Sequence, residues 1–500
     1  MTEFVQVHAK TGTYVGKVID GGVQEYLGIR YAKPVHRWKR AELPEPSDRL
    51  ITALEDNPAC YQMVAPEEFE TGEPPMSEDC LYLNVWTSGT EGKKPVYIFI
   101  HGGSYITGSC RTDCYGGVYC GDKFVAHYPD VVYVNIEYRT GPVGSMDLSR
   151  FEGGDEYAGS TNLQIHDQAL AIKWVYENIA AFGGDPERIT IGGQSAGSYS
   201  VYVLMAMPEV AGMIKGVIAE STAPSDEVLR QDAEACARGF DKLYELTGCK
   251  TLQDVLDLPV EELIKKGWEA KNEPGCMGLF GPVCTGEDLT DKIEEVWESG
   301  KLSHISLMSG TVAGEFATSV MHDSPEEIAE AIKGMYPEMT QADIDAYLTN
   351  VPGRDPHEAM EDMFNDLLIR AAQAKAAESV AKGGSSVYVY YMDLKPEGGT
   401  LRAQHCFEIP YVADKLDCGL YLDFKSGETL LGTNPDPEFG RKLRAVWHNF
   451  IATGDPNGEG VEPVWPAYTP EGRASMEMGK EWKAQGEIRS ADLDIARKYN

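Results

Sequence analysis

The chain has 500 residues, of which 42% are hydrophobic and 25% are charged. This is ordinary globular composition, which excludes a mostly disordered protein and leaves enough apolar surface for a large core. Lys and Arg number 44 against 79 Asp and Glu, which gives a formal net charge of -35. A surface this acidic repels nucleic-acid phosphates and anionic lipids, so we expect neither a nucleic-acid nor a membrane partner.

The N-terminus has no basic leader followed by an apolar stretch, and the apolar runs 96–100 and 131–136 are too short to cross a bilayer. We therefore expect a cytoplasmic location, although a mature secreted chain would look the same. The 11 cysteines are an odd number, so at least one thiol is unpaired within the chain. Cys110, Cys114 and Cys120 match no standard zinc spacing, and we expect no metal site.

Short β-branched runs and helical patterns alternate through the first half of the chain. The apolar residues between 163 and 182 recur at helical spacing, and Gly183 supplies a stop. The predicted elements are strands at Pro95–Ile100 and Val131–Ile136, a helix over 163–182, a strand at Arg188–Ile191, a helix from Ala196 and a strand at Ile214–Ala219. This alternation predicts a parallel sheet with right-handed crossovers.

The second half inserts helices between further strands, which we expect at Ile305–Met308 and Val387–Met392. Ser324-Pro325-Glu326-Glu327 reads as a capping box with Pro at the first helical position, and Asp355-Pro356-His357-Glu358 has a similar pattern. No linker is long enough to separate domains. We therefore predict one α/β domain over 1–500, with helical insertions at about 225–300 and 323–384.

The segment Gly193-Gln194-Ser195-Ala196-Gly197 is a G-x-S-x-G in which a predicted strand ends and a helix begins. A serine nucleophile needs this sharp turn, because it lifts the hydroxyl clear of the sheet, and the glycines leave room for the strained backbone. The pentapeptide alone is weak evidence, since a Gly-Ser turn is more often only a turn. Its place between a strand and a helix favours a nucleophile.

A second glycine-rich segment, His101-Gly102-Gly103-Ser104-Tyr105, directly follows the 95–100 strand. Small residues expose backbone N–H groups there, and such donors stabilise the charge that develops on a carbonyl oxygen. We assign the oxyanion-hole donors to Gly103 and Ser104, joined by Ala196 after the nucleophile. The alternative is a glycine turn without a ligand.

Where a serine nucleophile lies on a strand-to-helix turn of this kind, the acid and the histidine of the triad follow it in the chain in that order. Five histidines lie downstream of Ser195, namely His304, His322, His357, His405 and His448. His304 precedes the strand expected to present the acid, and His322 and His357 flank helix starts. His405 follows the Val387–Met392 strand and fits best. Glu315, which follows the Ile305–Met308 strand, is the leading candidate for the acid.

These segments resemble the type-B carboxylesterase/lipase family of α/β-hydrolases, which includes the cholinesterases and bacterial para-nitrobenzyl-type esterases. The resemblance covers nearly the whole chain. Its motifs are Gly28–Ala32, Ser77–Trp86, Phe182–Pro186, the Ser195 turn, Asn449-Phe450 with Thr453–Asn457, and Trp465-Pro466 with Tyr468. It implies a central, mostly parallel β-sheet flanked by helices, and a Ser195–Glu315–His405 triad.

The resemblance also implies a supporting pair, Ser221 and Glu408, that would hold the imidazole in place. The alternative is that both are merely polar loop residues. Cys60 and Cys80 match the first disulfide of the family, although they would stay thiols in a reducing cytosol.

Two departures from the family bear on the substrate. Where cholinesterases place a Trp against choline, this chain has Pro66-Glu67-Glu68-Phe69-Glu70, which argues against choline esters. The surrounding segment, Glu67–Asp79, is acidic and rich in Pro, unlike the apolar lid of a lipase, which disfavours long-chain triglycerides.

The sequence therefore predicts a serine carboxylic-ester hydrolase that cleaves short to medium acyl or aryl esters through an acyl-enzyme intermediate, without a metal or organic cofactor. An amide, carbamate or thioester hydrolase would use the same triad. A non-catalytic cholinesterase-like binding protein is the alternative from another class. The physiological ester and the oligomeric state stay open.

Overall fold

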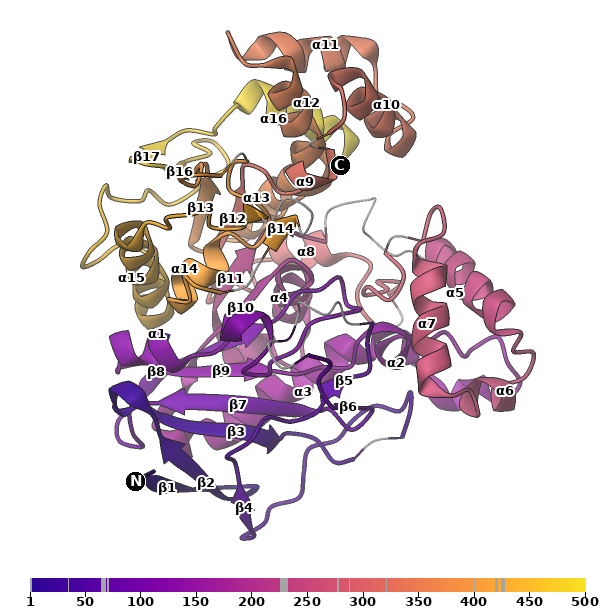
Figure 1. Cartoon of the computed structure of the whole chain (residues 1–500), viewed down its shortest axis with the longest axis vertical. Coiled ribbons are helices and arrows are strands. Elements are labelled where there is room, and N and C mark those ends of the chain that lie inside the picture. Colours follow the sequence, from indigo (N-terminus) through magenta and orange to yellow (C-terminus); the bar gives the residue numbers. More distant parts are fainter. Residues whose placement is uncertain are drawn as a thin grey trace. The chain divides into compact units, whose positions relative to one another are not determined.

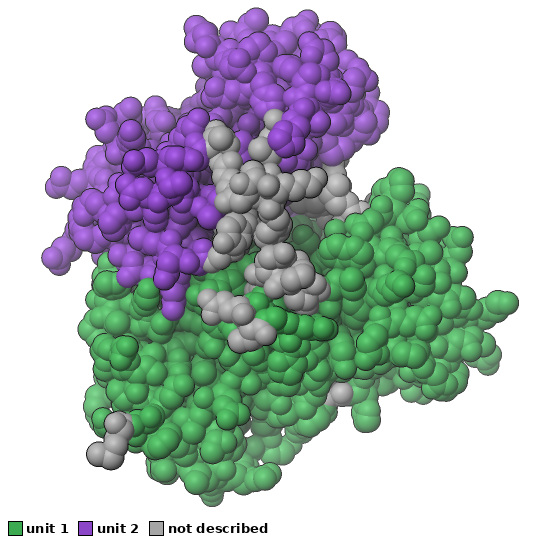
Figure 2. Space-filling view, viewed as in Figure 1, with its two compact units in different colours: residues 1–215, 229–293 green, residues 216–228, 294–500 purple. Residues whose placement is uncertain are grey.

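The structure is a computed structural model that describes residues 2–34, 36–63, 69, 72–224, 233–276, 278–286, 288–320, 322–399, 401–418, 421–423 and 428–500. The chain divides into two compact units, which Figure 2 shows in different colours. Unit 1 comprises residues 1–215 and 229–293, and unit 2 comprises residues 216–228 and 294–500.

Unit 1 contains a mixed sheet with the strand order β1-β2-β3-β7-β9-β8-β10, and β4 pairs with β2. β8 is parallel to both β9 and β10, which confirms the predicted parallel pairing. The antiparallel strands β1, β2, β3 and β7 precede this core, and the sequence analysis did not predict them. The bounds are β1 Phe4–Ala9, β2 Gly12–Val18, β3 Gln24–Arg30, β4 Leu50–Thr52, β7 Tyr82–Thr87, β8 Lys94–Ile100, β9 Val132–Ile136 and β10 Gly184–Gln194. β5 (Ala59–Cys60) and β6 (Met76–Ser77) form a separate pair.

The helices of unit 1 bury their apolar stripes as the sequence pattern predicts. α3 buries Ile172, Trp174 and Val175, and the chain leaves the following turn at Gly183 with a φ of 83°. α5 and α7 lie side by side (Figure 1). They contribute Phe240 and Leu263 to a buried apolar cluster that also includes Trp38. The bounds are α1 Asp122–His127, α2 Gly141–Gly144, α3 Leu163–Asn178, α4 Ala196–Ala206, α5 Ala233–Thr247, α6 Leu252–Leu256 and α7 Val260–Lys271.

Unit 2 contains the parallel strands β11, β12, β13 and β16, with β17 antiparallel to β16 at the edge. Their bounds are β11 Ile214–Glu220, β12 Ser306–Val312, β13 Val387–Met392, β16 Ser475–Met478 and β17 Trp482–Gln485, and β14 (Tyr421–Asp423) pairs with β15 (Glu428–Thr429). The helices are α8 Ile293–Glu298, which begins at the last residue of unit 1, α9 Ala317–Val320, α10 Pro325–Met335, α11 Gln341–Asn350, α12 Pro356–Asn365, α13 Ala371–Lys382, α14 Glu408–Ala413, α15 Pro437–Thr453 and α16 Ser490–Ala496.

The predicted caps are present in this unit. The Ser324 hydroxyl accepts from the Glu327 N–H while the Glu327 carboxylate accepts from the Ser324 N–H, which confirms the capping box of α10. Asp355 caps α12 by accepting from the N–H of His357. The single turns between the longer elements are η1 Asp20–Gly22, η2 Tyr115–Gly117, η3 Gly154–Tyr157, η4 Ser160–Asn162, η5 Ile179–Phe182, η6 Ala211–Met213, the π-helical η7 Asp366–Arg370 and η8 Arg497–Tyr499.

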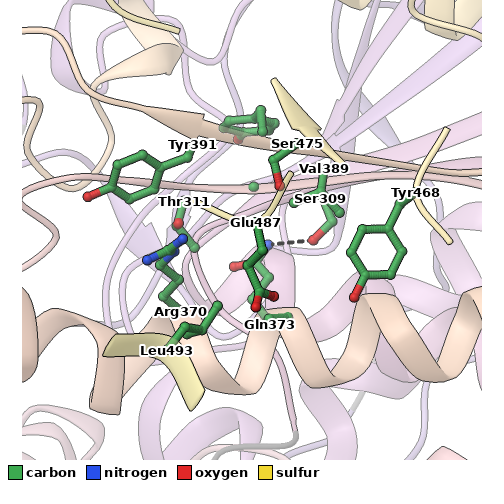
Figure 3. Close-up of a pocket in the computed structure, with 13 residues that line it drawn as sticks. Ser309, Thr311, Arg370, Gln373, Val389, Tyr391, Tyr468, Ser475, Glu487 and Leu493 are labelled. Carbon is green, nitrogen blue, oxygen red and sulfur yellow. Dashed lines mark hydrogen bonds between the residues drawn. The ribbon is translucent and has the colours of Figure 1, made fainter. Parts of the chain in front are cut away.

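A small polar cavity of about 30 Å³ lies in unit 2, between its sheet and the helices η7 and α13 (Figure 3). Ser309, Arg370, Tyr468 and Glu487 are among the residues that line it, and Gln373 donates across it to the Ser309 hydroxyl at 2.9 Å. This volume has room for about one water molecule and is too small for an ester substrate. Within the described residues, no helix is both long enough and apolar enough to span a membrane.

Candidate active site

Ser195 occupies a sharp turn between β10 and α4 in unit 1. Its backbone has φ 57° and ψ -122°, and such a positive φ is rare for a residue with a side chain. The turn depends on its glycines, because a Cβ on Gly197 would lie 2.1 Å from the carbonyl oxygen of Ile100, and one on Gly193 would lie 2.5 Å from the Gly197 backbone. The side chain of Ser195 is thereby held at the end of the strand, partly exposed.

The segment 101–105 reaches the same edge of the sheet. Gly193 in β10 is paired with Ile100, the last residue of β8, and the chain turns into the loop immediately afterwards. Because carboxyl ends of neighbouring parallel strands meet at one edge, Gly102 lies against the nucleophile turn, where a Cβ on it would be 3.1 Å from the Cβ of Ser195. The loop that carries the candidate oxyanion donors Gly103 and Ser104 thus begins beside Ser195, and the third candidate, Ala196, follows Ser195 in the chain.

The loop backbone is unusual at three successive residues. Gly103, Ser104 and Tyr105 have φ values of 100°, 55° and 60°. Such conformations persist only where the surroundings fix them. Here the Gly103 carbonyl accepts from the N–H groups of residues 106 and 107 at 2.9 and 3.0 Å, and the Tyr105 hydroxyl lies 2.9 Å from the Ser200 hydroxyl on α4.

The candidate acid and histidine lie together in unit 2. Nδ1 of His405 is 2.6 Å from Oε2 of Glu315, and the Glu315 side chain is 1% exposed while that of His405 is 19% exposed. The other Glu315 oxygen, Oε1, accepts from the N–H of Val312 at 2.9 Å. Since an ionised carboxylate only accepts hydrogen bonds, Nδ1 carries the proton and Nε2 is left as the basic nitrogen of His405.

The sheet explains how residues 90 positions apart meet. β12 and β13 are parallel and end at the paired residues Val312 and Met392. Beyond the strands the two segments meet again at Gly314 and Gln404, where the N–H of Gly314 donates to the carbonyl of Ala403 at 2.8 Å, next to Glu315 and His405. The ring of Phe316 packs against the imidazole with centroids 5.2 Å apart.

Asn365, at the end of α12, supports the segment that carries Glu315, and the sequence analysis missed it. Its side chain is buried, accepts from the N–H of Phe316 at 2.9 Å and donates to the carbonyl of Ala313 at 3.3 Å. The residue lies about 50 positions downstream in an ordinary helical pattern. Nothing local in the sequence distinguishes it from a surface Asn.

Ser221 and Glu408 are both fully buried in unit 2. Ser221 has a φ of 57° and donates its N–H to Gly310 in β12, and Glu408 accepts from the hydroxyl of Tyr390 at 3.0 Å. Burial, followed by repulsion from Glu315, raises the pKa of Glu408. The sequence analysis missed a second buried acid, Glu220, which accepts from the indole of Trp447 at 3.2 Å. Burial and then the nearby Glu408 raise the pKa of Glu220 as well.

Cys60 and Cys80 are neighbouring buried thiols in this structure, and the disulfide that the family resemblance implies stays a prediction. Hydrogen bonding to Cys60 and burial raise the pKa of the Cys80 thiol. Of the acidic segment Glu67–Asp79, residues 67, 68, 70 and 71 lie outside the described residues. The backbone of Phe69 forms an isolated antiparallel β-bridge with that of Cys114. No group of three or more His, Cys, Asp or Glu side chains suited to a metal ion occurs in the described part of the chain.

A nucleophile turn at the end of a parallel strand, a glycine loop beside it and a buried Glu–His pair define a serine ester hydrolase of the α/β-hydrolase fold. Residues 3–496 match the carboxylesterase family, and the chain belongs to that family. The resemblance drawn from the sequence motifs is thereby confirmed, as are the α/β-hydrolase fold and the assignment as an esterase.

Relatives of known sequence and structure agree with this assignment. The chain is 30% identical over 489 residues to the para-nitrobenzyl esterase of Bacillus subtilis, covering 95% of each chain. It is 27% identical over 515 residues to the acetylcholinesterase of Bungarus fasciatus, covering 93% of this chain and 81% of the relative. A solved carboxylesterase of Geobacillus stearothermophilus matches with a TM-score of 0.84 at 29% identity, covering 98% of this chain and 99% of that one. A solved PNB esterase matches with a TM-score of 0.79 at 28% identity, over the same shares of the two chains.

Proposed function

We propose that Ser195, His405 and Glu315 form the catalytic triad of this esterase and that hydrolysis proceeds through an acyl-enzyme. The observation that carries the proposal is the 2.6 Å contact between His405 Nδ1 and Glu315 Oε2, because it leaves Nε2 free of the proton. A histidine held in this tautomer is the general base that a serine nucleophile requires. The strained turn at Ser195 supports the role of its hydroxyl as that nucleophile.

In the first half-reaction the Ser195 oxygen bonds to the ester carbonyl carbon while its proton passes to Nε2 of His405. The carbonyl π electrons move onto the oxygen, and the N–H groups of Gly103, Ser104 and Ala196 stabilise that oxyanion. When the carbonyl re-forms, the bond to the alcohol oxygen breaks, and the imidazolium protonates the leaving alcohol. Glu315 stabilises the imidazolium throughout, because its carboxylate is buried and already hydrogen-bonded to Nδ1.

In the second half-reaction a water molecule gives a proton to Nε2 of His405 and bonds to the acyl carbon. The resulting oxyanion uses the same three N–H donors. Collapse breaks the bond to the Ser195 oxygen, which takes the proton back, and the acid leaves. Apart from the substrate and this water, the proposed steps use only these side chains and backbone amides.

We assign Ser221 and Glu408 to the support of His405, as the family pattern implies. Their complete burial in the unit that carries His405 supports this role. Glu408 also lies close enough to His405 for the imidazole to offset part of the rise in the pKa of Glu408. Positioning of this kind affects the rate through the orientation of the imidazole.

For the substrate we propose short to medium acyl or aryl esters. The similarity to a para-nitrobenzyl esterase supports aryl and benzyl alcohol groups. The formal net charge of -35 disfavours adsorption to anionic lipid surfaces, which supports dissolved esters over emulsified fat.

The test of the mechanism is the Ser195→Ala variant. We expect its kcat on p-nitrophenyl acetate to fall on the order of 10⁶-fold while its thermal melting is retained. A fluorophosphonate should add mass to the wild-type peptide that contains Ser195, and Ser149→Ala, which changes an exposed serine of the same unit, should react normally. Retained turnover in Ser195→Ala, or a label elsewhere, would remove Ser195 from the mechanism.

A series of p-nitrophenyl esters of increasing acyl length tests the substrate range. We expect kcat/KM to be highest for acyl chains of a few carbons and to fall toward the longest chains. The matching anilides should turn over more slowly, since the amide leaving group is poorer. A preference for emulsified long-chain esters would contradict the proposed substrate class.

A further inference from the structure

His101, the residue before the glycines of the 101–105 loop, is a buried polar side chain beside the proposed oxyanion donors. It is 1% exposed, and its Nδ1 lies 2.8 Å from the carbonyl oxygen of Gly102. A carbonyl oxygen only accepts, so Nδ1 carries the proton and donates it to Gly102. The imidazole therefore holds the peptide group that joins Gly102 to Gly103 through this hydrogen bond.

This single hydrogen bond also orients a second group. In a trans peptide the C=O and the N–H point in opposite directions, because the six peptide atoms lie in one plane. Fixing the carbonyl of Gly102 toward His101 therefore turns the N–H of Gly103 away from the imidazole. That N–H is one of the three donors proposed for the oxyanion, and Gly102 itself lies against the Ser195 turn.

The surroundings hold the imidazole rigidly. Its ring stacks on Tyr138 with centroids 4.3 Å apart and an interplanar angle of 15°, and the Tyr138 hydroxyl donates to the carbonyl of His101 at 2.8 Å. Gly108 covers the His101–Gly102 hydrogen bond, since a Cβ there would lie 2.4 Å from Nδ1 and 2.7 Å from the Gly102 oxygen. Gly108 thus shields this hydrogen bond from solvent on one side.

The remaining ring nitrogen shows that the histidine is kept neutral. Nε2 is buried and has no hydrogen-bond partner among the described residues. Burial lowers the pKa of His101 to about 4, against a smaller opposing effect of the Gly102 hydrogen bond. A neutral imidazole with its proton on Nδ1 is therefore present throughout the range in which an esterase works, so the donor to Gly102 is constant.

We propose that His101 is a positioning residue for catalysis, which aims the Gly103 N–H at the oxyanion through its hydrogen bond to the Gly102 carbonyl. The inference rests on the proposed function, in which Gly103 is an oxyanion donor. It deepens that function by assigning a role to a side chain that never touches the substrate. Phe and Leu would fill the same volume without a donor, and the Gly102–Gly103 peptide would then be free to rotate.

The experiment compares His101→Phe with His101→Asn, whose Nδ2 occupies nearly the place of the imidazole Nδ1. For p-nitrophenyl acetate we expect kcat to fall about 100-fold in His101→Phe, with KM within about threefold, because oxyanion contacts act in the transition state. His101→Asn should recover at least a tenth of the wild-type kcat. Inhibition by a trifluoromethyl ketone, whose adduct with serine carries an oxyanion, should weaken in His101→Phe by a factor similar to the loss in kcat.

Tyr31→Phe is the matched control, because it removes a buried tyrosine hydrogen bond to a backbone carbonyl of the same unit, that of Glu137 at 2.7 Å, and leaves the contacts of His101 in place. It should lower the melting temperature while kcat stays within about threefold of the wild type. Should His101→Phe fail to fold, His101→Gln replaces it, since its amide lies one bond farther out, and Asn should then exceed Gln in kcat at least tenfold.

The inference is overturned if His101→Phe keeps kcat within threefold, if kcat falls while the affinity for the ketone is unchanged, or if Gln equals Asn. These results are distinct from failure of the proposed function. In that case the wild type would not be labelled by fluorophosphonate at Ser195, whereas an intact label with an unaffected His101→Phe rejects only the role of His101.

Discussion

Replacing Glu315 with Gln tests the proposed triad most directly, because the two contacts of this carboxylate determine how the amide group of Gln is oriented. Oε1 of Glu315 accepts from the N–H of Val312, and Oε2 accepts from Nδ1 of His405. In Glu315→Gln one oxygen becomes an NH₂ group. An NH₂ facing the Val312 N–H would bury two donors against each other, so the amide oxygen stays at Val312 and the NH₂ faces His405.

The NH₂ then donates to Nδ1, which forces the imidazole proton onto Nε2. In that tautomer His405 cannot take the proton of Ser195. We expect kcat to fall by about 10⁴-fold, equivalent to about 5.4 kcal/mol of barrier. Stability should change little, because the Val312 hydrogen bond is kept and the shape is preserved.

The assay is kcat on p-nitrophenyl acetate, with thermal melting followed by circular dichroism as the measure of folding. Glu330→Gln is the control, since Glu330 is an exposed glutamate of the same unit and its side chain is 79% exposed. It should behave as the wild type. If Glu315→Gln folds normally and keeps more than a tenth of the wild-type kcat, the role of Glu315 as the orienting acid is refuted.

Four further changes test other parts of the structure. Asp167→Asn removes the charge that pairs with buried Arg139 at 2.6 Å, and it should lower the free energy of unfolding in urea by about 3–5 kcal/mol. Glu177→Gln removes one charge of a surface ion pair and should lower the free energy of unfolding by less than about 1 kcal/mol. Equal losses of unfolding free energy in these two variants would contradict the distinction between buried and surface pairs. Asn365→Ala should lower the free energy of unfolding by about 1–3 kcal/mol and reduce kcat. An unchanged kcat would show that the segment carrying Glu315 keeps its conformation without these two hydrogen bonds. Burial raises the pKa of Glu361 to about 7, so its protonated form stabilises the fold at low pH and this contribution is lost as the pH rises toward 7. Glu361→Gln should flatten the fall in unfolding free energy between pH 5 and 7 by up to about 1.4 kcal/mol per pH unit, and an identical slope would exclude such a titration.

The sequence predicted the elements that are specified locally. β8, β9, α4 and the capping box of α10 lie where the patterns of apolar, glycine and capping residues placed them, because each pattern is complete within about ten residues. The antiparallel strands β1, β2, β3 and β7 went unpredicted. In β2 and β3 the apolar alternation is broken by charged and glycine residues. The pairing of such strands decides their conformation more than their own composition does.

The turn at Ser195 and the glycine loop at 101–105 were readable from the sequence alone, since the glycines and small residues that make such a backbone possible are adjacent in the chain. The contact between the acid and the histidine, by contrast, is not specified by residues that are adjacent in the chain. The Glu315–His405 contact joins positions 90 residues apart. It depends on the register of β12 with β13, which no segment encodes by itself. The buried neighbours Asn365 and Glu220 and the hydrogen bond of His101 likewise became visible only when the chain was folded, because burial and hydrogen-bond partners are properties of the packed structure and not of the residue type.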